Sequence, residues 1–396
     1  MRQSDTVTAA CGYWRRRGLS TEPEQVVAAP GAALLLLALL AAVGDGTRDQ
    51  ADPADSADAP ATLGLAARHP RVPARGDVLL PCPTADWHAA QAGLLSRQAH
   101  PVSVPAECGG IPDPVALRET VRRVRAGGGA PRVLLLSVAD DPTGTIASPE
   151  LLHEVCEAAV DEGLLIISDE SWRDTAHDPR ETVVVSPAEM LGHGGRDSVV
   201  VLAGLEVSLL PDGPQAGIAR FPASPYGHRL SARVREILET LHAGPHGADD
   251  AAIAAALTEP AAVRKRLAAE SAVYGARAAA LHTVLTEAGA LCRPPRVGWF
   301  LYADLEQWRS RLAARGVTDA PGLEAELVRR LGPYVSGGHR FGDEPGGLRV
   351  RLSADVLGTE RAAGPEQVPE QVPEEAAVRR VRTELAELLG DGAGTA

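Results

Sequence analysis

The sequence predicts an α/β protein, in which a mostly parallel sheet lies sandwiched between helices and a smaller C-terminal α+β domain follows. Continuous apolar runs such as Arg132–Val138 and Leu164–Ser168 are typical of strands that are covered on both faces. Helical patterns separate these runs, and an alternation of strand and helix is typical of parallel sheets. From about residue 290 onward, strand and helix patterns mix without this alternation, which indicates the smaller domain.

The first part of the predicted sheet begins with a strand, a tight turn and a helix. Val26 and Val27 are β-branched, Pro30-Gly31 is a turn signal, and the apolar run that follows ends at Gly44. Residues 45–75 are rich in Asp, Ala and Pro without a sustained period, so we expect a disordered surface insertion there. Residues 77–81, which carry Val78, Leu79 and Leu80 in a row, then predict a short buried strand.

The apolar run at residues 32–43 raises the question of secretion or membrane insertion. It is 12 residues long, whereas a helix that spans a bilayer needs about 20 residues. This length suits the apolar part of a signal peptide, but Glu22, Glu24 and Pro30 separate the run from Arg15–Arg17. We therefore expect a buried core helix in a cytoplasmic protein with no membrane partner, and secretion is the less favoured alternative.

Helix start and stop signals place the next elements. Ser148 is suited to cap a helix and Pro149 to begin it, apolar residues then recur at helical spacing, and Gly163 ends the pattern. Apolar stretches at residues 198–202 and 217–221 predict two further strands, and residues 248–288 have a helical pattern. We therefore expect a large α/β domain over residues 26–288, preceded by a shortened N-terminal segment at residues 1–25.

The predicted small domain covers residues 289–396. Strand patterns at residues 297–305 and 347–354 flank a helical pattern at residues 319–332. Residues 362–375 form an acidic loop rich in Pro and Glu, and a last amphipathic helix is expected beyond it.

Composition excludes several classes of function. The net charge is −13 and no block of Lys and Arg is large enough for a nucleic-acid footprint. The five cysteines are an odd number and include no CxxC pair, which argues against a disulfide framework or a metal site. Scattered free cysteines suit a reducing cytoplasm.

Polar motifs follow two successive strands of the predicted sheet. They are "DDPTG" at residues 140–144 and "SDESW" at residues 168–172. Ligands of parallel α/β sheets bind at the carboxyl ends of the strands. Residues 31–33 open a helix at the same kind of place, and free N–H groups at a helix N-terminus can hold a phosphate.

These segments resemble the class I/II aminotransferases, the pyridoxal phosphate (PLP) enzymes of fold type I. Residues 140–174 are similar to the family's NPTG loop, helix and SDExY strand, and residues 204–222 are similar to its SLSKxxxxxGxRxGxxRFP segment. Residues 347–354 resemble the strand that carries its substrate-carboxylate arginine. The resemblance covers roughly residues 10–360. It implies a PLP-dependent transferase that forms a homodimer, or a heterodimer with an active paralogue.

The resemblance assigns to Asp169 the role of partner to the pyridine nitrogen of PLP, since a carboxylate keeps that nitrogen protonated. Two neighbouring positions depart from the family. Trp172 stands where the family has a tyrosine that bonds the ring hydroxyl, and indole can only donate a hydrogen bond. Asp141 stands where the family has an asparagine, and an ionised carboxylate there would repel the phenolate oxygen of PLP.

The position of the Schiff-base lysine is the main departure from the family. An alignment without gaps puts Val207 there, and valine has no amine to form an internal aldimine or to shuttle a proton. The chain has one lysine, Lys265, which lies in a charged helical stretch that we expect on the surface.

The phosphate site has also lost side chains that the resemblance implies. Gln215 replaces an arginine and Gly204 replaces a serine, while Gly31, Ala32 and Ala33 keep backbone N–H groups without side-chain donors. Removing one partner of a buried ion pair costs about 3–5 kcal/mol, and this corresponds to a loss in PLP affinity on the order of 10²–10³. The resemblance thus implies PLP as the cofactor, and these replacements predict impaired binding without an aldimine at Val207.

Further positions concern ring stacking and the substrate. Ala85 stands where the family has an aromatic that stacks on the PLP ring, with Trp87 and His88 displaced along the strand. Arg349 best matches the substrate-carboxylate arginine, and Arg351 is its alternative if the register differs. A bidentate arginine is suited to a carboxylate.

Three functions remain open at this point. The favoured one is an aminotransferase-like protein that has lost transamination. The first alternative is an active aminotransferase for a small amino acid and a 2-oxo acid, which would have to use Lys265. The second alternative is a lysine-free protein that binds an amino acid or pyridoxamine phosphate through polar side chains, namely Asp169, Asp141, Glu206 and Arg349.

Overall fold

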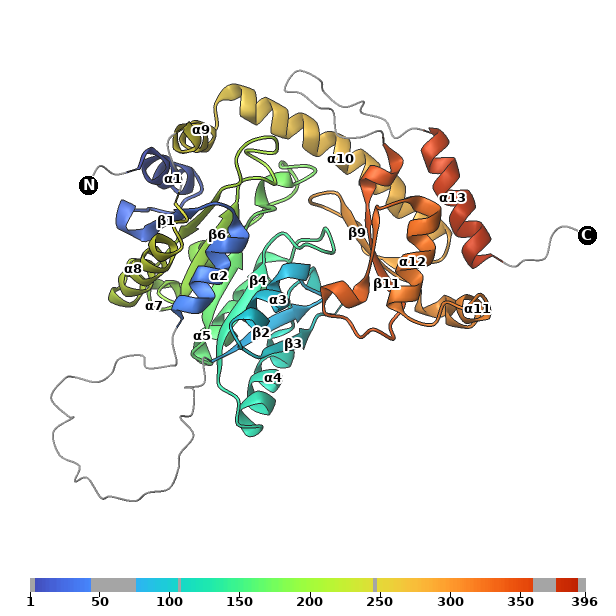
Figure 1. Cartoon of the computed structure of the whole chain (residues 1–396), viewed down its shortest axis with the longest axis horizontal. Helices are drawn as coiled ribbons and strands as arrows, with labels where there is room; N and C mark the ends of the chain where they lie inside the picture. Colours follow the sequence, from blue (N-terminus) through green and yellow to red (C-terminus); the bar gives the residue numbers. More distant parts are fainter. Residues whose placement is uncertain (1–3, 44–75, 106–107, 245–247, 359–374, 391–396) are drawn as a thin grey trace, which may run out of the picture.

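The computed structural model describes residues 4–43, 76–105, 108–244, 248–358 and 375–390. The predicted insertion at residues 45–75 lies outside the described residues, as does the predicted acidic loop apart from Glu375. Figure 1 shows two β-sheets side by side, with helix α10 (Ala261–Glu287) running along both.

The larger sheet has seven strands in the order β1-β7-β6-β5-β4-β2-β3. Strands β3, β2, β4, β5 and β6 are parallel to one another, while β7 is antiparallel to both of its neighbours, β6 and β1. The prediction of a mostly parallel sheet in an α/β fold is therefore confirmed. The strands are β1 (Val26–Ala29), β2 (Asp77–Cys82), β3 (Ala99–Ser103), β4 (Pro131–Ser137), β5 (Leu165–Asp169), β6 (Val199–Gly204) and β7 (Gly217–Arg220).

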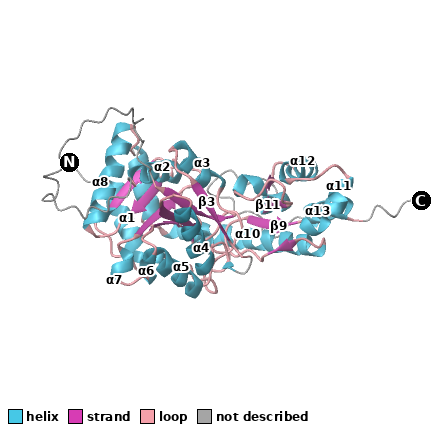
Figure 2. Cartoon of the chain, turned by 90° about the horizontal axis from the view of Figure 1, so that it is seen from below, coloured by secondary structure: helices cyan, strands magenta, loops and turns pink. Residues whose placement is uncertain are grey.

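Helices cover both faces of this sheet (Figure 2). One face packs against α2 (Ala32–Ala42), α3 (Asp86–Leu94) and α8 (Pro225–Thr240). The other face packs against α1 (Asp5–Arg16), α4 (Pro114–Ala126), α5 (Pro149–Asp161), α6 (Pro187–Met190) and α9 (Ala248–Leu257). Successive strand residues enter opposite cores, as Leu134 and Leu135 do on β4, because side chains alternate across a strand.

Local sequence signals explain where the helices begin. The hydroxyl of Ser148 accepts the N–H of Leu151 and so caps α5, as its position before Pro149 predicts. Asp113 caps α4 in the same way, ahead of Pro114. The apolar run expected as a core helix forms α2, whose residues Leu35, Leu36 and Leu39 are fully buried.

The smaller sheet has four antiparallel strands in the order β10-β11-β9-β8. A second hydrophobic core joins this sheet to its helices and to the C-terminal half of α10, which contributes Leu281 and Leu285. The elements are β8 (Leu291–Cys292), β9 (Phe300–Asp304), α11 (Arg309–Ala314), α12 (Ala320–Leu331), β10 (Val335–Gly337), β11 (Arg349–Ser353) and α13 (Glu375–Leu389).

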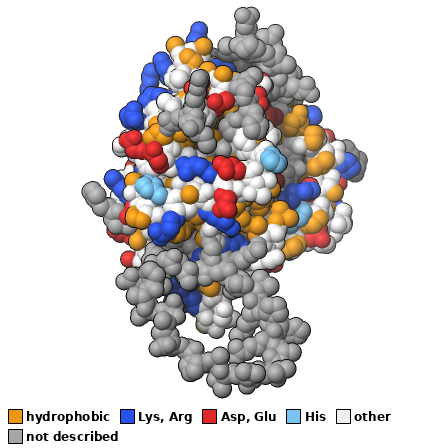
Figure 3. Space-filling model, turned by 60° about the vertical axis from the view of Figure 1, so that its left-hand side comes forward, with side chains coloured by type: hydrophobic (Ala, Val, Ile, Leu, Met, Phe, Trp, Pro, Cys, Tyr) orange, Lys and Arg blue, Asp and Glu red, His pale blue; other side chains and the backbone are white. Residues whose placement is uncertain are grey.

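The surface mixes charges of both signs. On the face in Figure 3, blue and red side chains alternate with hydrophobic ones, and neither sign gathers into a continuous patch there. No helix among the described residues is long and apolar enough to cross a bilayer. Within the same residues, no group of three or more His, Cys, Asp or Glu side chains is arranged to hold a metal ion.

Candidate functional site

The candidate site lies at the carboxyl edge of the large sheet, where β5 ends at Asp169. The strand register pairs Asp169 with Ser137 on β4 and with Leu202 on β6. Asp169 is 5% exposed, so its carboxylate must find partners inside the protein. The sheet thus brings the two predicted motifs, at residues 140–144 and 168–172, to the same edge.

Asp169 has partners from its own chain. Its Oδ1 accepts the N–H of Ser171 at 2.9 Å and the Oγ–H of Ser171 at 2.6 Å. Ser171 Oγ also accepts the N–H of Gly204 at 2.8 Å, which ties the end of β5 to the end of β6. The second oxygen, Oδ2, lies 3.5 Å from Nε2 of His88, and this histidine side chain is fully buried.

His88 reaches Asp169 because the chain turns into a helix before it. The sequence suggested that Trp87 and His88 continue along the strand, and this was wrong. Strand β2 ends at Cys82 and α3 begins at Asp86, so His88 lies on the first turn of a helix. Its Nδ1 is 2.9 Å from the hydroxyl of Thr84, and its ring packs edge-on against Trp87.

The N-terminus of α2 meets the end of β6 across a set of small residues. Gly31 caps α2 with a positive φ of 89°, a conformation that glycine adopts readily. A Cβ added at Gly31 would lie 3.8 Å from Oε1 of Gln215, so the amide of Gln215 faces this turn. A Cβ added at Gly204 would lie 3.2 Å from Cβ of Ala32. Ala33, the third predicted residue here, is exposed.

Glu206 also reaches this place, just after β6 ends. A Cβ added at Gly204 would lie 2.9 Å from its Oε1. The backbone N–H groups of Glu206, Leu205 and Ala32 favour its ionised form. Its Oε2 is buried and has no hydrogen-bond partner. Burial raises the pKa of Glu206 and the charge of Asp169 adds to this effect, while the three N–H groups oppose it.

Val207 and Trp172 lie beside an aromatic cluster. Val207 follows in the same turn and lines a small hollow together with Tyr274 and Trp299. The ring centroid of Trp172 is 4.5 Å from that of Trp299 and 5.5 Å from that of Phe300. Lys265 is exposed on α10.

Asp141 and Arg351 join the two sheets. Nη1 of Arg351, on β11, donates to Oδ1 of Asp141 at 2.8 Å. The guanidinium lies over the rings of Phe300 and Phe341, 3.9 Å and 4.5 Å from their centroids. Burial raises the pKa of Asp141, and Arg351 opposes this shift. The alternative arginine of the sequence analysis is thus the one that lies beside Asp141.

Arg349 faces a different cavity. Its Nε donates to Asp304 at 2.9 Å and its Nη1 to Asp343 at 3.3 Å. The side chain is 46% exposed. Together with Cys82 and Tyr302 it lines a cavity of about 1190 Å³ between the edge of the large sheet and the small sheet. Asp141, which the sequence analysis grouped with Arg349, does not line this cavity.

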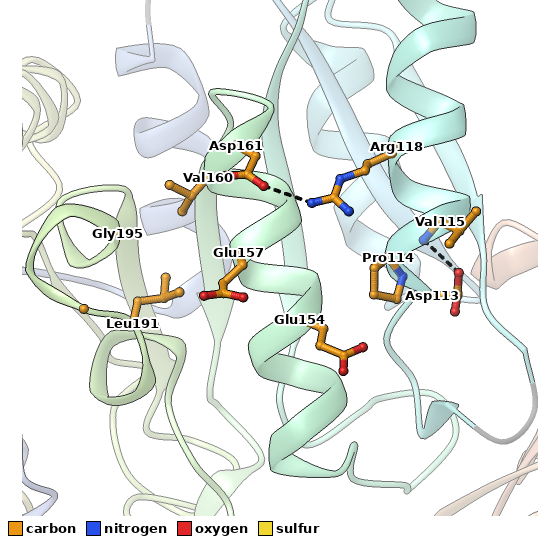
Figure 4. A pocket seen from close by; sticks show the side chains of 11 residues that line it. Asp113, Pro114, Val115, Arg118, Glu154, Glu157, Val160, Asp161, Leu191 and Gly195 are labelled. Carbon is orange, nitrogen blue, oxygen red and sulfur yellow. Dashed lines mark hydrogen bonds and ion pairs between the residues drawn. The ribbon is translucent and has the colours of Figure 1, made fainter.

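A further groove lies on the outer side of the helices, away from these residues (Figure 4). It has a volume of about 610 Å³ and lies along α4 and α5, where Arg118 pairs with Asp161 at 2.9 Å. None of the residues predicted for the cofactor site lines it.

Asp140 is a buried acid that the sequence analysis did not single out. It is 3% exposed, and Thr143 Oγ1 donates to its Oδ2 at 2.5 Å. Burial raises the pKa of Asp140 to about 8, against the hydrogen bonds from Thr143. Its position directly after a buried strand was the available signal.

We expect Asp140→Asn to change how stability depends on pH. Because the folded-state pKa of about 8 lies above the ordinary 3.8, folding favours the protonated acid, and stability falls as pH rises between these values. The slope from one such group approaches ~1.4 kcal/mol per pH unit. The free energy of unfolding of the variant, measured with urea at several pH values in this range, should therefore fall less steeply with pH than that of the wild type. An unchanged slope would show that Asp140 is ionised in the folded protein.

We expect Asp141→Ala to destabilise the protein by about 2–3 kcal/mol, because Arg351 would be left without its carboxylate. This is below the ~3–5 kcal/mol typical of a fully buried pair, since the contacts with two aromatic rings remain. Arg118→Gln is the matched control. It breaks an exposed pair with Asp161 and should cost no more than ~1 kcal/mol. Equal effects in denaturant unfolding would contradict the role given to Asp141.

Known proteins share both the sequence pattern and the fold. The pattern of the family described as aminotransferase class I and II matches residues 71–361. The chain is 27% identical over 319 residues to 4-dedimethylamino-4-oxo-anhydrotetracycline transaminase OxyQ of Streptomyces rimosus, covering 79% of this chain and 73% of that protein. It is 32% identical over 105 residues to LL-diaminopimelate aminotransferase of Desulforudis audaxviator, which is 26% of this chain and a quarter of that protein's length.

A solved structure extends the comparison to nearly the whole chain. Aspartate aminotransferase from Thermus thermophilus with maleate superposes with a TM-score of 0.69 at 19% identity, covering 97% of this chain and 81% of that one. At this identity the likeness concerns the fold. The family pattern covers well over half of the chain, and the protein is therefore a member of the class I and II aminotransferase family, whose cofactor is PLP.

Proposed function

We propose that this family member has lost transamination and acts as a non-catalytic aminotransferase homologue. The proposal rests on the alignment without gaps, which puts Val207 in the Schiff-base position. In the structure Val207 lines a hollow with Tyr274 and Trp299. A transaminase needs an amine there, both to hold the cofactor covalently and to move a proton during the reaction. Valine can do neither.

The residues present do not fit PLP as the family holds it. Next to the N-terminus of α2, Gln215 offers a neutral amide in place of a cation. The buried, unpartnered Oε2 of Glu206 lies in the same region, where a second anion would be repelled. Asp169 remains a suitable partner for a cationic ring, but Ser171 already donates to it twice. We therefore assign no reaction step to the cofactor in this chain.

The substrate side of the site supports the same proposal. Arg351 is better placed than Arg349 to be the arginine that once bound a substrate carboxylate, since Arg349 pairs with Asp304 and Asp343 around another cavity. Arg351, however, is neutralised by Asp141. A substrate carboxylate would have to displace this internal one, with a loss of the ion pair that already exists.

The two alternatives draw less support. An active aminotransferase would depend on Lys265, which is exposed on α10. A lysine-free binding protein would need its four polar side chains in one pocket, whereas Arg349 lines a cavity to which Asp141, Asp169 and Glu206 do not contribute. We further propose that the protein is cytoplasmic and that it forms a homodimer, or a heterodimer with an active paralogue.

The test is a search for a covalent adduct with PLP. The wild-type protein is mixed with one equivalent of PLP, reduced with borohydride and analysed by peptide mass mapping. We expect no stoichiometric pyridoxyl adduct, because the position is valine. Val207→Lys should gain an adduct at residue 207, which would confirm the alignment.

Lys265→Ala is the matched control, since it removes the lysine of the wild-type chain. A stoichiometric adduct at Lys265 in the wild-type protein, together with turnover of an amino acid and a 2-oxo acid that the variant lacks, would contradict the proposed loss of activity.

A further inference from the structure

The strongest unassigned feature of the molecule is the carboxylate of Glu206 at the N-terminus of α2. This helix is 11 residues long, has no acidic residue in its first turn and receives no side-chain cap from Gly31. Helix N-termini leave unpaired N–H groups and carry partial positive charge, so they attract anions. The carboxylate of Glu206 and the first residue of the helix, Ala32, both lie beside Gly204, and the backbone N–H of Ala32 favours the ionised form of Glu206. The anion at this helix is thus supplied by the chain.

Small residues make room for this carboxylate. A Cβ at Gly204 would approach Glu206 Oε1 to 2.9 Å and Ser171 Oγ to 3.1 Å, so a side chain at this position would collide with both. A Cβ at Gly217 would lie 2.7 Å from the N atom of Ala32. The two glycines therefore keep open the space in which Glu206 reaches the backbone of α2.

The surroundings of Glu206 are only partly favourable to its ionised carboxylate. Its Oε2 is buried without a partner, and the nearby charge of Asp169 on β5 disfavours its ionised form. The groups named as favouring its ionised form are backbone N–H groups, those of Glu206, Leu205 and Ala32. A carboxylate held in this way competes directly with any other anion for the same donors.

We propose that Glu206 is an internal plug: its carboxylate occupies the phosphate cradle at α2 and excludes inorganic phosphate and phosphorylated ligands from it. The inference rests on the proposed function, because it concerns a site that no longer holds PLP. In this proposal the N-terminus of α2, with Gly204 and Gly217 beside it, still has the shape of a phosphate site, and the side chain of Glu206 fills it. Removing the charge or the bulk of Glu206 opens an anion site.

The experiment is calorimetric titration of the purified full-length protein with inorganic phosphate, against sodium chloride at the same ionic strength. The wild-type protein should give no saturable heat. Glu206→Gln removes the charge and keeps the size, and Glu206→Ala removes both. At least one of them should bind phosphate at least tenfold more tightly than the wild type. Glu154→Gln, an exposed glutamate on α5, is the matched control and should behave as the wild type.

Two results would overturn the plug. One is saturable phosphate binding by the wild type as tight as in the variants, and the other is no binding by either variant when circular dichroism shows both to be folded. The test contains no PLP, so it separates the two proposals. Phosphate binding by the wild type would leave the argument from Val207 intact, whereas an adduct with PLP would remove the proposed function whatever the phosphate titration gives.

Discussion

Charges buried at the carboxyl edge of the large sheet need partners, and this constraint organises the candidate site. Removing an ion from water without a partner is among the costliest events in folding. Asp169 is held by Ser171, with His88 nearby. Arg351 is held by Asp141, and Glu206 by backbone N–H groups that include that of Ala32. These partners come from the chain itself, so most of the buried charge at this edge of the sheet is compensated without a bound ligand.

This internal balance explains how an enzyme fold can persist without its reaction. An ancestral site that bound a phosphate and a carboxylate would leave a helix N-terminus and an arginine uncompensated when its ligands were lost. In our proposal Glu206 and Asp141 fill these two roles, so the packing of α2 against β6 and of β11 against the residue 140–144 loop survives. The small sheet then stays joined to the large one through Asp141 and Arg351.

The fold was predictable from the sequence because burial on both faces gives continuous apolar runs, as at β4 and β5, and capping residues such as Ser148 mark helix starts. The site was harder. Arg349 and Arg351 lie two residues apart on one strand and so point to the same face. The sequence therefore could not show that Arg349 pairs with Asp304 and Asp343 whereas Arg351 pairs with Asp141, because this depends on where β11 lies in the fold. The sequence named Glu206 as a polar group but could not show where it lies; β6 ends at Gly204, and the turn beyond it carries Glu206 towards α2.

The most direct measurement is an experimental structure of the wild-type protein crystallised with excess PLP and, separately, with inorganic phosphate. We predict that in both crystals the Glu206 carboxylate lies at the N-terminus of α2 beside Gly204, and that Arg351 pairs with Asp141, as they do here. A phosphoryl group bound to the N-terminus of α2, with Glu206 turned away from it, would contradict the account.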